Sequence, residues 1–331
     1  LLETQLIETI LLNILNFQSL IATKASRIKV AAGEQSVVLD FGLRRSQGLG
    51  GIHATRAAMI GGFDGTSNVY SAMRFGIPAG GTMAHSWVQS FDDELTAFRT
   101  YARYYPEDTV LLVDTYDTLQ SGVPNAILVA KELQEKGYCL KAIRLDSGDL
   151  AYFSRKARNM LDEAGFHNVK IAASNQLDER VITSLRTQDA PIDIYGVGTK
   201  LVTGHPSPAL DGVYKLSSFN GEPKLKISEN IEKITLPGKK KIFRYFNEDG
   251  TFYGDAILLN DEKVIERMHH PTFPAQKSDV TRRRHEEILH PVVKSGNVLA
   301  SELSINAISS YRKERLAKLQ REFKRLEYPH I

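Results

Sequence analysis

The stretch from Gly61 to Ser90 reads GGFDGTSNVYSAMRFGIPAGGTMAHSWVQS and sets many glycines among short polar side chains. A hydrophobic core does not require this mixture. Glycines let main-chain N–H groups approach an anion, while hydroxyl, carboxylate and imidazole groups supply directed contacts. The stretch therefore predicts a ligand-binding segment, with a turn-rich connection between helices as the alternative.

Composition sets limits on the class of protein. The chain has 331 residues, of which 42% are hydrophobic and 24% charged, so it can bury a large core as one large α/β domain or two smaller ones. The net charge of +3 and two short basic runs, residues 239–241 and 282–284, are too little for a dedicated nucleic-acid binder. The single cysteine, Cys139, excludes an intrachain disulfide and is interpreted as a small buried hydrophobe in a reducing compartment.

No stretch reaches the roughly 18 uninterrupted apolar residues of a membrane span, and no signal peptide opens the chain. We therefore expect a cytoplasmic protein without a membrane or nucleic-acid partner. The chain begins at Leu1, without Met, inside a helical pattern. This start leads us to expect a fragment.

Hydrophobic periodicity predicts an amphipathic helix from Glu3 to about Arg27 that packs on one side. Short apolar runs then alternate with helical segments at intervals of about 25 to 40 residues, which is typical of βα units around a parallel sheet. The predicted strands are 37–41, 77–83, 110–113, 142–145, 169–173 and 192–195. The predicted helices are 53–60, 86–104, 125–135, 150–164 and 178–186. Periodicity leaves open and closed sheets possible, but no G-x-G-x-x-G follows the first strand, which favours a closed, irregular α/β barrel.

The pattern changes after Thr203. Apolar alternation predicts antiparallel strands at 213–217, 224–227, 242–246 and 251–259, with a hairpin turn from Asn247 to Gly250. A charged helix from about Ile308 to Leu326 follows. We therefore predict an α/β barrel over residues 1–203, and over 204–331 the end of the barrel, a β-rich region and a C-terminal helix.

Residues capable of chemistry follow each predicted strand at its carboxyl end. In parallel α/β folds these ends share one face, where active sites are built from the loops. The residues are Phe41, Arg44, Thr82, His85, Asp114, Thr115, Asp117, Arg144, Asp146, Ser147, Asp149, Ser174, Asn175, Gly196, Gly198 and Thr199. Packing alone does not account for such a repeated coincidence.

Each of these groups has more than one interpretation. Gly198 and Thr199 offer amides and a hydroxyl for a phosphate, or form a plain turn. Arg144 and Asp146 point to the same side of a strand, where they could bind a carboxylate and ribose hydroxyls, or pair with each other. His85 has no second His or Cys at metal-ligand spacing, so we expect a catalytic role rather than a structural metal.

Six ordered motifs now carry a resemblance that covers nearly the whole chain. They are DFGLRRSQG at 40–48, GGFDGTSN at 61–68, GTMAHS at 81–86, LVDTYDT at 112–118, RLDSGDL at 144–150 and YGVGT at 195–199. Together they resemble the nicotinate phosphoribosyltransferase family. The resemblance implies an irregular α/β barrel with a second domain built from the two chain ends. It also implies a homodimer with shared active sites and an N-terminal segment that this chain lacks.

The resemblance further implies a reaction. Nicotinate and 5-phosphoribosyl 1-pyrophosphate would give nicotinate mononucleotide and pyrophosphate in NAD salvage, with ATP as co-substrate and a phosphorylated histidine. The implied roles are stacking on the pyridine ring for Phe41, nicotinate contacts for Arg144 and Thr82, and ribose binding for Asp146. Arg44 would face the phosphates, Gly198 and Thr199 would bind the 5-phosphate, and His85 would carry the phosphoryl group.

This chemistry suits the residues, because departure of pyrophosphate needs anion binding and Mg²⁺ more than a strong base. We expect His85, Asp146 and Asp114 to be catalytic, while Asp64, Asp114 and Asp117 are candidate metal or ribose contacts. A phosphoribosyltransferase for nicotinamide or quinolinate is the nearest alternative. The second alternative is a non-catalytic phosphate-binding barrel. An aldolase-type barrel would need a lysine that forms a Schiff base, and these strand ends contain none.

Overall fold

The computed structural model describes residues 2–227, 229, 234–263, 265–271, 273–299 and 303–327. The chain divides into two compact units. One is Asn13–Asp211, and the other joins Leu1–Leu12 to Gly212–Ile331.

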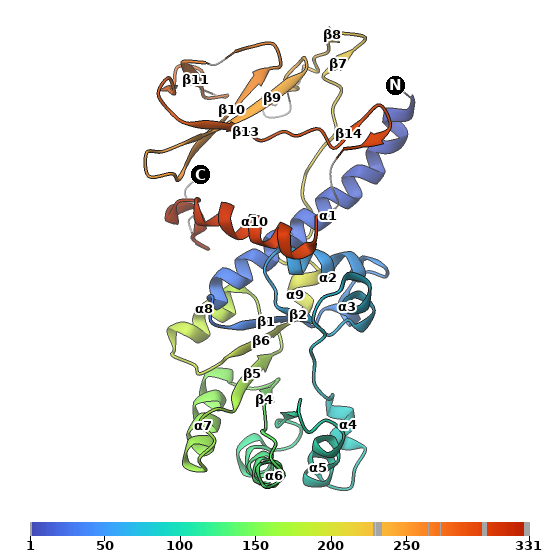
Figure 1. The fold of residues 1–331 in the computed structure, drawn as a ribbon, viewed down its shortest axis with the longest axis vertical. Helices are drawn as coiled ribbons and strands as arrows, with labels where there is room; N and C mark the ends of the chain where they lie inside the picture. The colour runs from blue at the N-terminus through green and yellow to red at the C-terminus, as the bar shows by residue number, and fades with distance from the viewer. Residues whose placement is uncertain are drawn as a thin grey trace. The chain divides into compact units, whose positions relative to one another are not determined.

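A six-stranded parallel sheet forms the centre of the unit Asn13–Asp211, with the order β2-β1-β6-β5-β4-β3 (Figure 1). Its strands are β1 (Val37–Asp40), β2 (Gly65–Thr66), β3 (Val110–Leu112), β4 (Ala142–Leu145), β5 (Lys170–Ser174) and β6 (Ile194–Val197). The sheet is curled, and among the described residues its edge strands β2 and β3 are not paired with each other. The predicted α/β class is confirmed, and the barrel takes the form of an open half-barrel.

Helices connect the strands of this unit. They are α1 (Leu2–Ala32), which begins in the other unit, α2 (Gly50–Ile60), α3 (Val69–Phe75), α4 (His85–Gln89), α5 (Glu94–Tyr104), α6 (Val123–Glu135), α7 (Leu150–Glu163), α8 (Glu179–Thr187) and α9 (Thr199–Val202). Two short helical turns, η1 (Leu43–Arg45) and the π-helical η2 (Thr118–Gly122), follow β1 and β3. Side-chain caps explain several helix starts, since Asp93, Asp149 and Asp178 accept backbone N–H groups at the first turns of α5, α7 and α8.

Five of the six predicted strands are confirmed to within two residues at each end, and one is wrong. Residues 77–83 form a loop with a single bridge from Ala79 to Thr66, and the sixth strand is instead the two-residue β2. The predicted helix 86–104 is also divided, because Asp93 caps a new helix after a bend. A strand of two residues is too short for its periodicity to be recognised.

The helix α1 buries only its second half. Burial begins at Leu20 and continues through Ile21, Ala25 and Ile28, whereas Leu6 and Ile10 are exposed. The predicted packing along one whole side is therefore wrong for the first half of the helix. By length and composition α1 is the one helix in the described part of the chain that could cross a membrane, a weak indication because core helices of soluble proteins meet the same criteria.

The other unit contains small antiparallel sheets. Its largest sheet has the order β10-β9-β13, formed by β9 (Lys240–Phe246), β10 (Phe252–Leu259) and β13 (His285–Glu287). Two-stranded sheets pair β7 (Ser218–Phe219) with β8 (Glu222–Pro223), β11 (Arg267–His269) with β12 (Lys277–Asp279), and β14 (Val293–Lys294) with β15 (Asn297–Val298). Tyr245, Ala256, Leu258 and Val280 form a buried cluster on the main sheet.

The sequence predicted this unit less completely. The strands at 242–246 and 251–259 and their hairpin turn are confirmed, but 213–217 and 224–227 are not strands. The predicted C-terminal helix is shorter, with α10 at Ile305–Ala317 followed by a 3₁₀ turn, η4, at Arg321–Lys324. Cys139 is exposed between α6 and β4, so its predicted burial is wrong.

Candidate functional site

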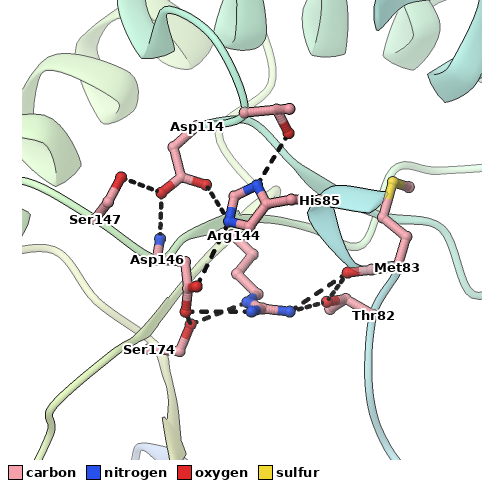
Figure 2. Close-up of polar contacts among 9 residues, drawn as sticks. Thr82, Met83, His85, Asp114, Arg144, Asp146, Ser147 and Ser174 are labelled. Atoms are coloured by element: carbon pink, nitrogen blue, oxygen red, sulfur yellow. Dashed lines mark hydrogen bonds and ion pairs between the residues drawn. The ribbon is translucent and has the colours of Figure 1, made fainter. Parts of the chain in front are cut away.

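Polar side chains from three neighbouring strands meet at the carboxyl end of the half-barrel (Figure 2). Asp114 follows β3, Arg144 and Asp146 lie at the end of β4, and Ser174 ends β5. Parallel pairing aligns these strand ends, with Leu112 opposite Arg144 and Arg144 opposite Ala172. Residues on different strands of this cluster are 28 to 60 positions apart in the sequence, and the register of the sheet brings them together.

Arg144 is the most connected side chain of the cluster. Its Nε donates to Ser174 Oγ at 2.9 Å, its NH1 donates to the Thr82 hydroxyl, and its NH2 lies 3.2 Å from Asp146 Oδ1. The pairing of Arg144 with Asp146 that the sequence left open is therefore present. The guanidinium nevertheless lies at a pocket, where its carbon is 5.5 Å from the centre of the Phe41 ring.

His85 lies between two carboxylates. Its Nε2 is 3.5 Å from Asp146 Oδ2 and 3.8 Å from Asp114 Oδ1, and its Nδ1 is 3.1 Å from Thr115 Oγ1. The imidazole is 36% exposed, so a ligand in the pocket can reach it. A proton on Nε2 would face both carboxylates and leave the Nδ1 lone pair to accept from Thr115.

The two carboxylates differ in their surroundings. Burial on its own raises the pKa of Asp146, but the hydrogen bond from Ser174 and the charges of Arg144 and His85 outweigh it and lower that pKa. Asp114 has a side chain that is only 1% exposed, and its Oδ2 accepts from Asp146 N at 2.8 Å and from Ser147 Oγ at 2.6 Å. Its buried Oδ1 has no hydrogen-bond partner. Asp114 thus orders the loop after β4 and keeps one oxygen free for a donor or a cation.

A pocket of about 470 Å³ opens beside this cluster. Its lining residues are Phe41, Arg44, Ser67, Gly81, Thr82, Met83, Ala84, His85, Ser86, Arg144 and Asp146. Phe41 packs against β6 where Gly196 leaves room, because a Cβ at Gly196 would lie 2.5 Å from two ring carbons. The pocket combines an aromatic face, a guanidinium and hydroxyls, which suits a flat ring that carries a carboxylate.

Gly198 and Thr199 lie beside this region at the start of α9. A Cβ at Gly198 would approach the Phe41 carbonyl oxygen at 3.0 Å, so the turn after β6 runs close to the turn after β1. The structure therefore brings nine of the predicted site residues to the pocket or directly beside it. They are Phe41, Arg44, Thr82, His85, Asp114, Arg144, Asp146, Gly198 and Thr199.

Asp64 lies elsewhere. It precedes β2, and its Oδ2 accepts from Val38 N at 2.8 Å and from Lys29 Nζ at 2.9 Å, at the amino end of the sheet. Asp117 is on the correct side but caps η2, where its Oδ1 accepts from the backbone N–H groups of Leu119 and Gln120. Both carboxylates thus have structural partners, and the metal or ribose contacts expected of them stay predictions.

Other residues at the site had received no role from the sequence. Ser174 links Arg144 to Asp146, Ser67 lines the pocket, and the carbonyl of Met83 lies 3.5 Å from Arg144 NH1. The position of Ser174 after an apolar strand was a usable signal. Every residue has a main-chain carbonyl, so the sequence cannot indicate that the one of Met83 faces the site.

No group of three or more His, Cys, Asp or Glu side chains within the described ranges could hold a metal ion. Mg²⁺, however, is commonly bound by one or two carboxylates together with substrate phosphates. Asp146 and Oδ1 of Asp114, which accepts no hydrogen bond within the described residues, offer such carboxylate oxygens. The residues therefore fit Mg²⁺ only as an ion whose coordination a phosphorylated substrate completes.

Comparisons with known proteins agree on one family. Residues 37–271 match the Nicotinate phosphoribosyltransferase (NAPRTase) family, and residues 239–331 match the Nicotinate phosphoribosyltransferase C-terminal domain. A nicotinate phosphoribosyltransferase of Bacillus subtilis is 48% identical over 99% of this chain and 69% of its own length. One of Dictyostelium discoideum is 37% identical over 98% of this chain and 65% of its own length. The chain thus spans about two thirds of the length of these relatives.

Solved structures give the same result. Human nicotinic acid phosphoribosyltransferase superposes with a TM-score of 0.85 at 29% identity, over 98% of this chain and 73% of that one. Nicotinate-nucleotide pyrophosphorylase from Pyrococcus furiosus has a TM-score of 0.76 at 29% identity, over 94% and 73% of the two chains.

Proposed function

Because the chain belongs to the nicotinate phosphoribosyltransferase family, we propose that it joins nicotinate to 5-phosphoribosyl 1-pyrophosphate. The products are nicotinate mononucleotide and pyrophosphate. The pyridine nitrogen attacks C1 of the ribose, and the bond from C1 to the pyrophosphate oxygen breaks with its electron pair on the leaving group. The reaction needs little base catalysis, because the nitrogen lone pair is already free.

The observation that carries the proposal is the position of Arg144 beside Phe41 and Thr82 in one pocket. An aromatic ring can stack on the Phe41 face, while the guanidinium and the Thr82 hydroxyl meet a carboxylate on that ring. Nicotinamide lacks the carboxylate, and quinolinate carries a second one. The pocket therefore favours nicotinate among the pyridine bases.

The remaining site residues act on the ribose and phosphates. Asp146 is held ionised by Arg144 and Ser174, so it can accept hydrogen bonds from ribose hydroxyls. Gly198 and Thr199 offer main-chain N–H groups and a hydroxyl to the 5-phosphate. Bound through Asp114 and Asp146, Mg²⁺ would neutralise charge on the departing pyrophosphate.

We propose in addition that ATP hydrolysis is coupled through phosphorylation of His85. An imidazole nitrogen attacks the terminal phosphorus of ATP, and the bond from phosphorus to the ADP oxygen breaks with its electron pair on ADP. Water then attacks the phosphohistidine, which releases inorganic phosphate and restores the imidazole. His85 Nε2 faces two carboxylates within 3.8 Å, whereas Nδ1 faces the Thr115 hydroxyl at 3.1 Å, so attack by Nδ1 requires this hydroxyl to turn away from the ring. This step would place the enzyme in ATP-driven NAD salvage, and we expect a cytoplasmic location.

The direct test incubates the protein with 5-phosphoribosyl 1-pyrophosphate, Mg²⁺, ATP and one of nicotinate, nicotinamide or quinolinate. Chromatography should detect a mononucleotide with nicotinate alone. Turnover of quinolinate or nicotinamide in its place would establish one of the related transferases. Absence of product with every base, although the phosphate donor binds, would favour a non-catalytic barrel.

The coupling step has its own test. His85→Asn should abolish acid-labile labelling by the terminal phosphate of ATP and leave some ATP-independent transfer. His167→Asn is the matched control, because His167 also lies beside a carboxylate, 3.0 Å from Asp162, but at an exposed position away from the pocket. Undiminished labelling of His85→Asn would remove this histidine from the mechanism.

A further inference from the structure

Asp40 is a buried carboxylate directly behind the pocket. It ends β1, is 1% exposed, and immediately precedes Phe41. Within the described part of the chain, the groups that donate to its side chain are one backbone N–H and two hydroxyls, and none of them is charged. A carboxylate buried without a cation destabilises a core, so hydrophobic packing does not explain its presence.

The carboxylate joins three separate segments. Its Oδ1 accepts from Gly42 N at 2.8 Å, in the turn that follows Phe41. Its Oδ2 accepts from Thr55 Oγ1 at 2.7 Å, in α2, and from Thr66 Oγ1 at 2.9 Å, in β2. One side chain thus holds together the ends of β1 and β2 and the helix between them.

Asn68 fixes the direction of these hydrogen bonds. Its backbone N–H donates to Thr66 Oγ1 at 3.0 Å, and its side-chain Nδ2 donates to Thr55 Oγ1 at 3.3 Å. Each hydroxyl oxygen accepts from Asn68 and keeps its own proton to donate. Asp40 Oδ2 is the nearer acceptor for both protons, since Gly51 O lies 3.1 Å from Thr55 Oγ1 and Asp40 O lies 3.4 Å from Thr66 Oγ1. An ionised carboxylate accepts at both oxygens, whereas an amide in its place would present a donor to these hydroxyls.

The main chain of Asp40 also contacts Ser67, a residue that lines the pocket. Its carbonyl oxygen accepts from Ser67 N at 2.9 Å and from Ser67 Oγ at 3.1 Å. Phe41 N in turn donates to Val197 O at 2.8 Å. Ser67 is therefore held by the carbonyl of Asp40. Phe41 is held by Val197 of β6 and, through the next residue Gly42, by the Asp40 carboxylate.

We propose that Asp40 is a positioning residue that holds Phe41 and Ser67 in place to bind the pyridine base. The proposal rests on the proposed function, since it takes Phe41 to be the ring on which the base stacks. Burial raises the pKa of Asp40 against the opposing effect of its hydrogen bonds, which agrees with a carboxylate retained at a cost in stability.

Asp40→Asn tests the proposal with an almost unchanged shape. The KM for nicotinate should rise about tenfold to a hundredfold, the range expected when a binding group is displaced. The KM for 5-phosphoribosyl 1-pyrophosphate should stay within about twofold, whatever the melting temperature of the variant. A lower melting temperature with an unchanged KM for nicotinate would overturn the proposal.

A pair of isosteric variants covers the case in which Asp40→Asn fails to fold. Thr55→Val removes a hydroxyl that donates to Asp40, and Thr109→Val removes an equally buried hydroxyl that donates to Tyr105 O at 2.6 Å, before β3 at the amino end. Only Thr55→Val should raise the KM for nicotinate. Equal effects of the two variants on that KM would show that Asp40 has no specific link to the base.

A final measurement does not depend on turnover. Hydrogen exchange of the peptides that cover residues 41–47 and 66–68 should accelerate in Asp40→Asn and in Thr55→Val, but not in Thr109→Val. If the wild-type protein makes no mononucleotide, the proposed function fails while the exchange data still test the positioning. Unchanged exchange in both Asp40→Asn and Thr55→Val would overturn the positioning role.

Discussion

Carboxylates lie at both ends of the parallel sheet, and the two ends use them differently. At the amino end, Asp64 accepts from the backbone N–H of Val38, and Asp193 accepts from that of Ile171 at 2.9 Å. Asp64 also pairs with Lys29, whose side chain is only 12% exposed, and Asp193 pairs with the exposed Lys170. At this end the carboxylates tie neighbouring strands together.

At the carboxyl end, the carboxylates of Asp114 and Asp146 converge on one imidazole beside a pocket. The oxygen of Asp114 that faces this imidazole, Oδ1, is buried and accepts no hydrogen bond within the described residues. The contrast teaches that a polar residue near a strand end has a functional role when several such residues face one cavity, and a structural role when each satisfies a separate backbone amide.

The largest expected contrast is in nicotinate affinity, between Arg144→Ala at the carboxyl end of the sheet and a matched variant near the amino end. Removing a guanidinium that would pair with a buried carboxylate should cost about 2 to 5 kcal/mol of nicotinate affinity, measurable by isothermal titration. The control is Arg158→Ala, because Arg158 binds the carbonyl oxygens of Val169 and Phe166 near the amino end. Arg158→Ala should lower the free energy of unfolding and leave nicotinate affinity intact. Wild-type affinity in Arg144→Ala would mean that the carboxylate is bound elsewhere.

Gly196→Ala should have the next largest effect. Its Cβ would lie 2.5 Å from the Phe41 ring, and overpacking of this kind costs about 1 to 3 kcal/mol as the ring shifts away. The KM for nicotinate should rise accordingly. Gly165→Ala, at the amino end, would meet no atom within 4 Å but has a φ of +86°, so it should lose roughly 1 to 2 kcal/mol of stability with an unchanged KM. A rise in KM for both variants would erase the distinction between the ends.

A smaller contrast is expected in how the free energy of unfolding changes at acidic pH. The pKa of Asp146 is lowered from its ordinary value of 3.8, so the ionised carboxylate stabilises the native state above about pH 4, and this stabilisation is lost as the pH falls through the lowered value. In urea unfolding, the stability difference between wild type and Asp146→Asn should therefore shrink below pH 4. Desolvation on its own raises the pKa of Asp162, but His167 and Arg158 outweigh it and lower that pKa too. This carboxylate is more exposed than that of Asp146. Asp162→Asn should therefore show the same trend with a smaller amplitude that added salt reduces. A constant difference for Asp146→Asn down to pH 2.5 would contradict the prediction.

Asp64→Asn should have the smallest effect. An amide oxygen can still accept from Val38 N, so the loss is confined to the Lys29 interaction and should be about 0.5 to 1.5 kcal/mol of unfolding free energy. Substrate KM values should not change. An increase in the KM for either substrate would restore Asp64 to the site and break the comparison.

The sequence by itself determined the class of fold and the face of the sheet, at the carboxyl ends of the strands, where the polar residues gather. Apolar runs at residues 37–41, 110–113 and 142–145 alternate with helical periods, and this local pattern is enough to predict parallel βα units. Because the carboxyl ends of such strands share one face, Asp114, Arg144 and Asp146 could be placed together from the sequence. His85 was assigned to the same face from a predicted strand, 77–83, that is a loop in the structure.

Tertiary structure alone decided the rest. The two-residue strand Gly65–Thr66 exists because it pairs with β1, and Asp64 is thereby placed at the amino end, where Val38 and Lys29 occupy its carboxylate. Neither fact has a local signature. Strand pairing and hydrogen-bond partners link residues distant in the chain, so the same Asp, Gly or Thr can hold a backbone or face a ligand according to what the fold brings beside it.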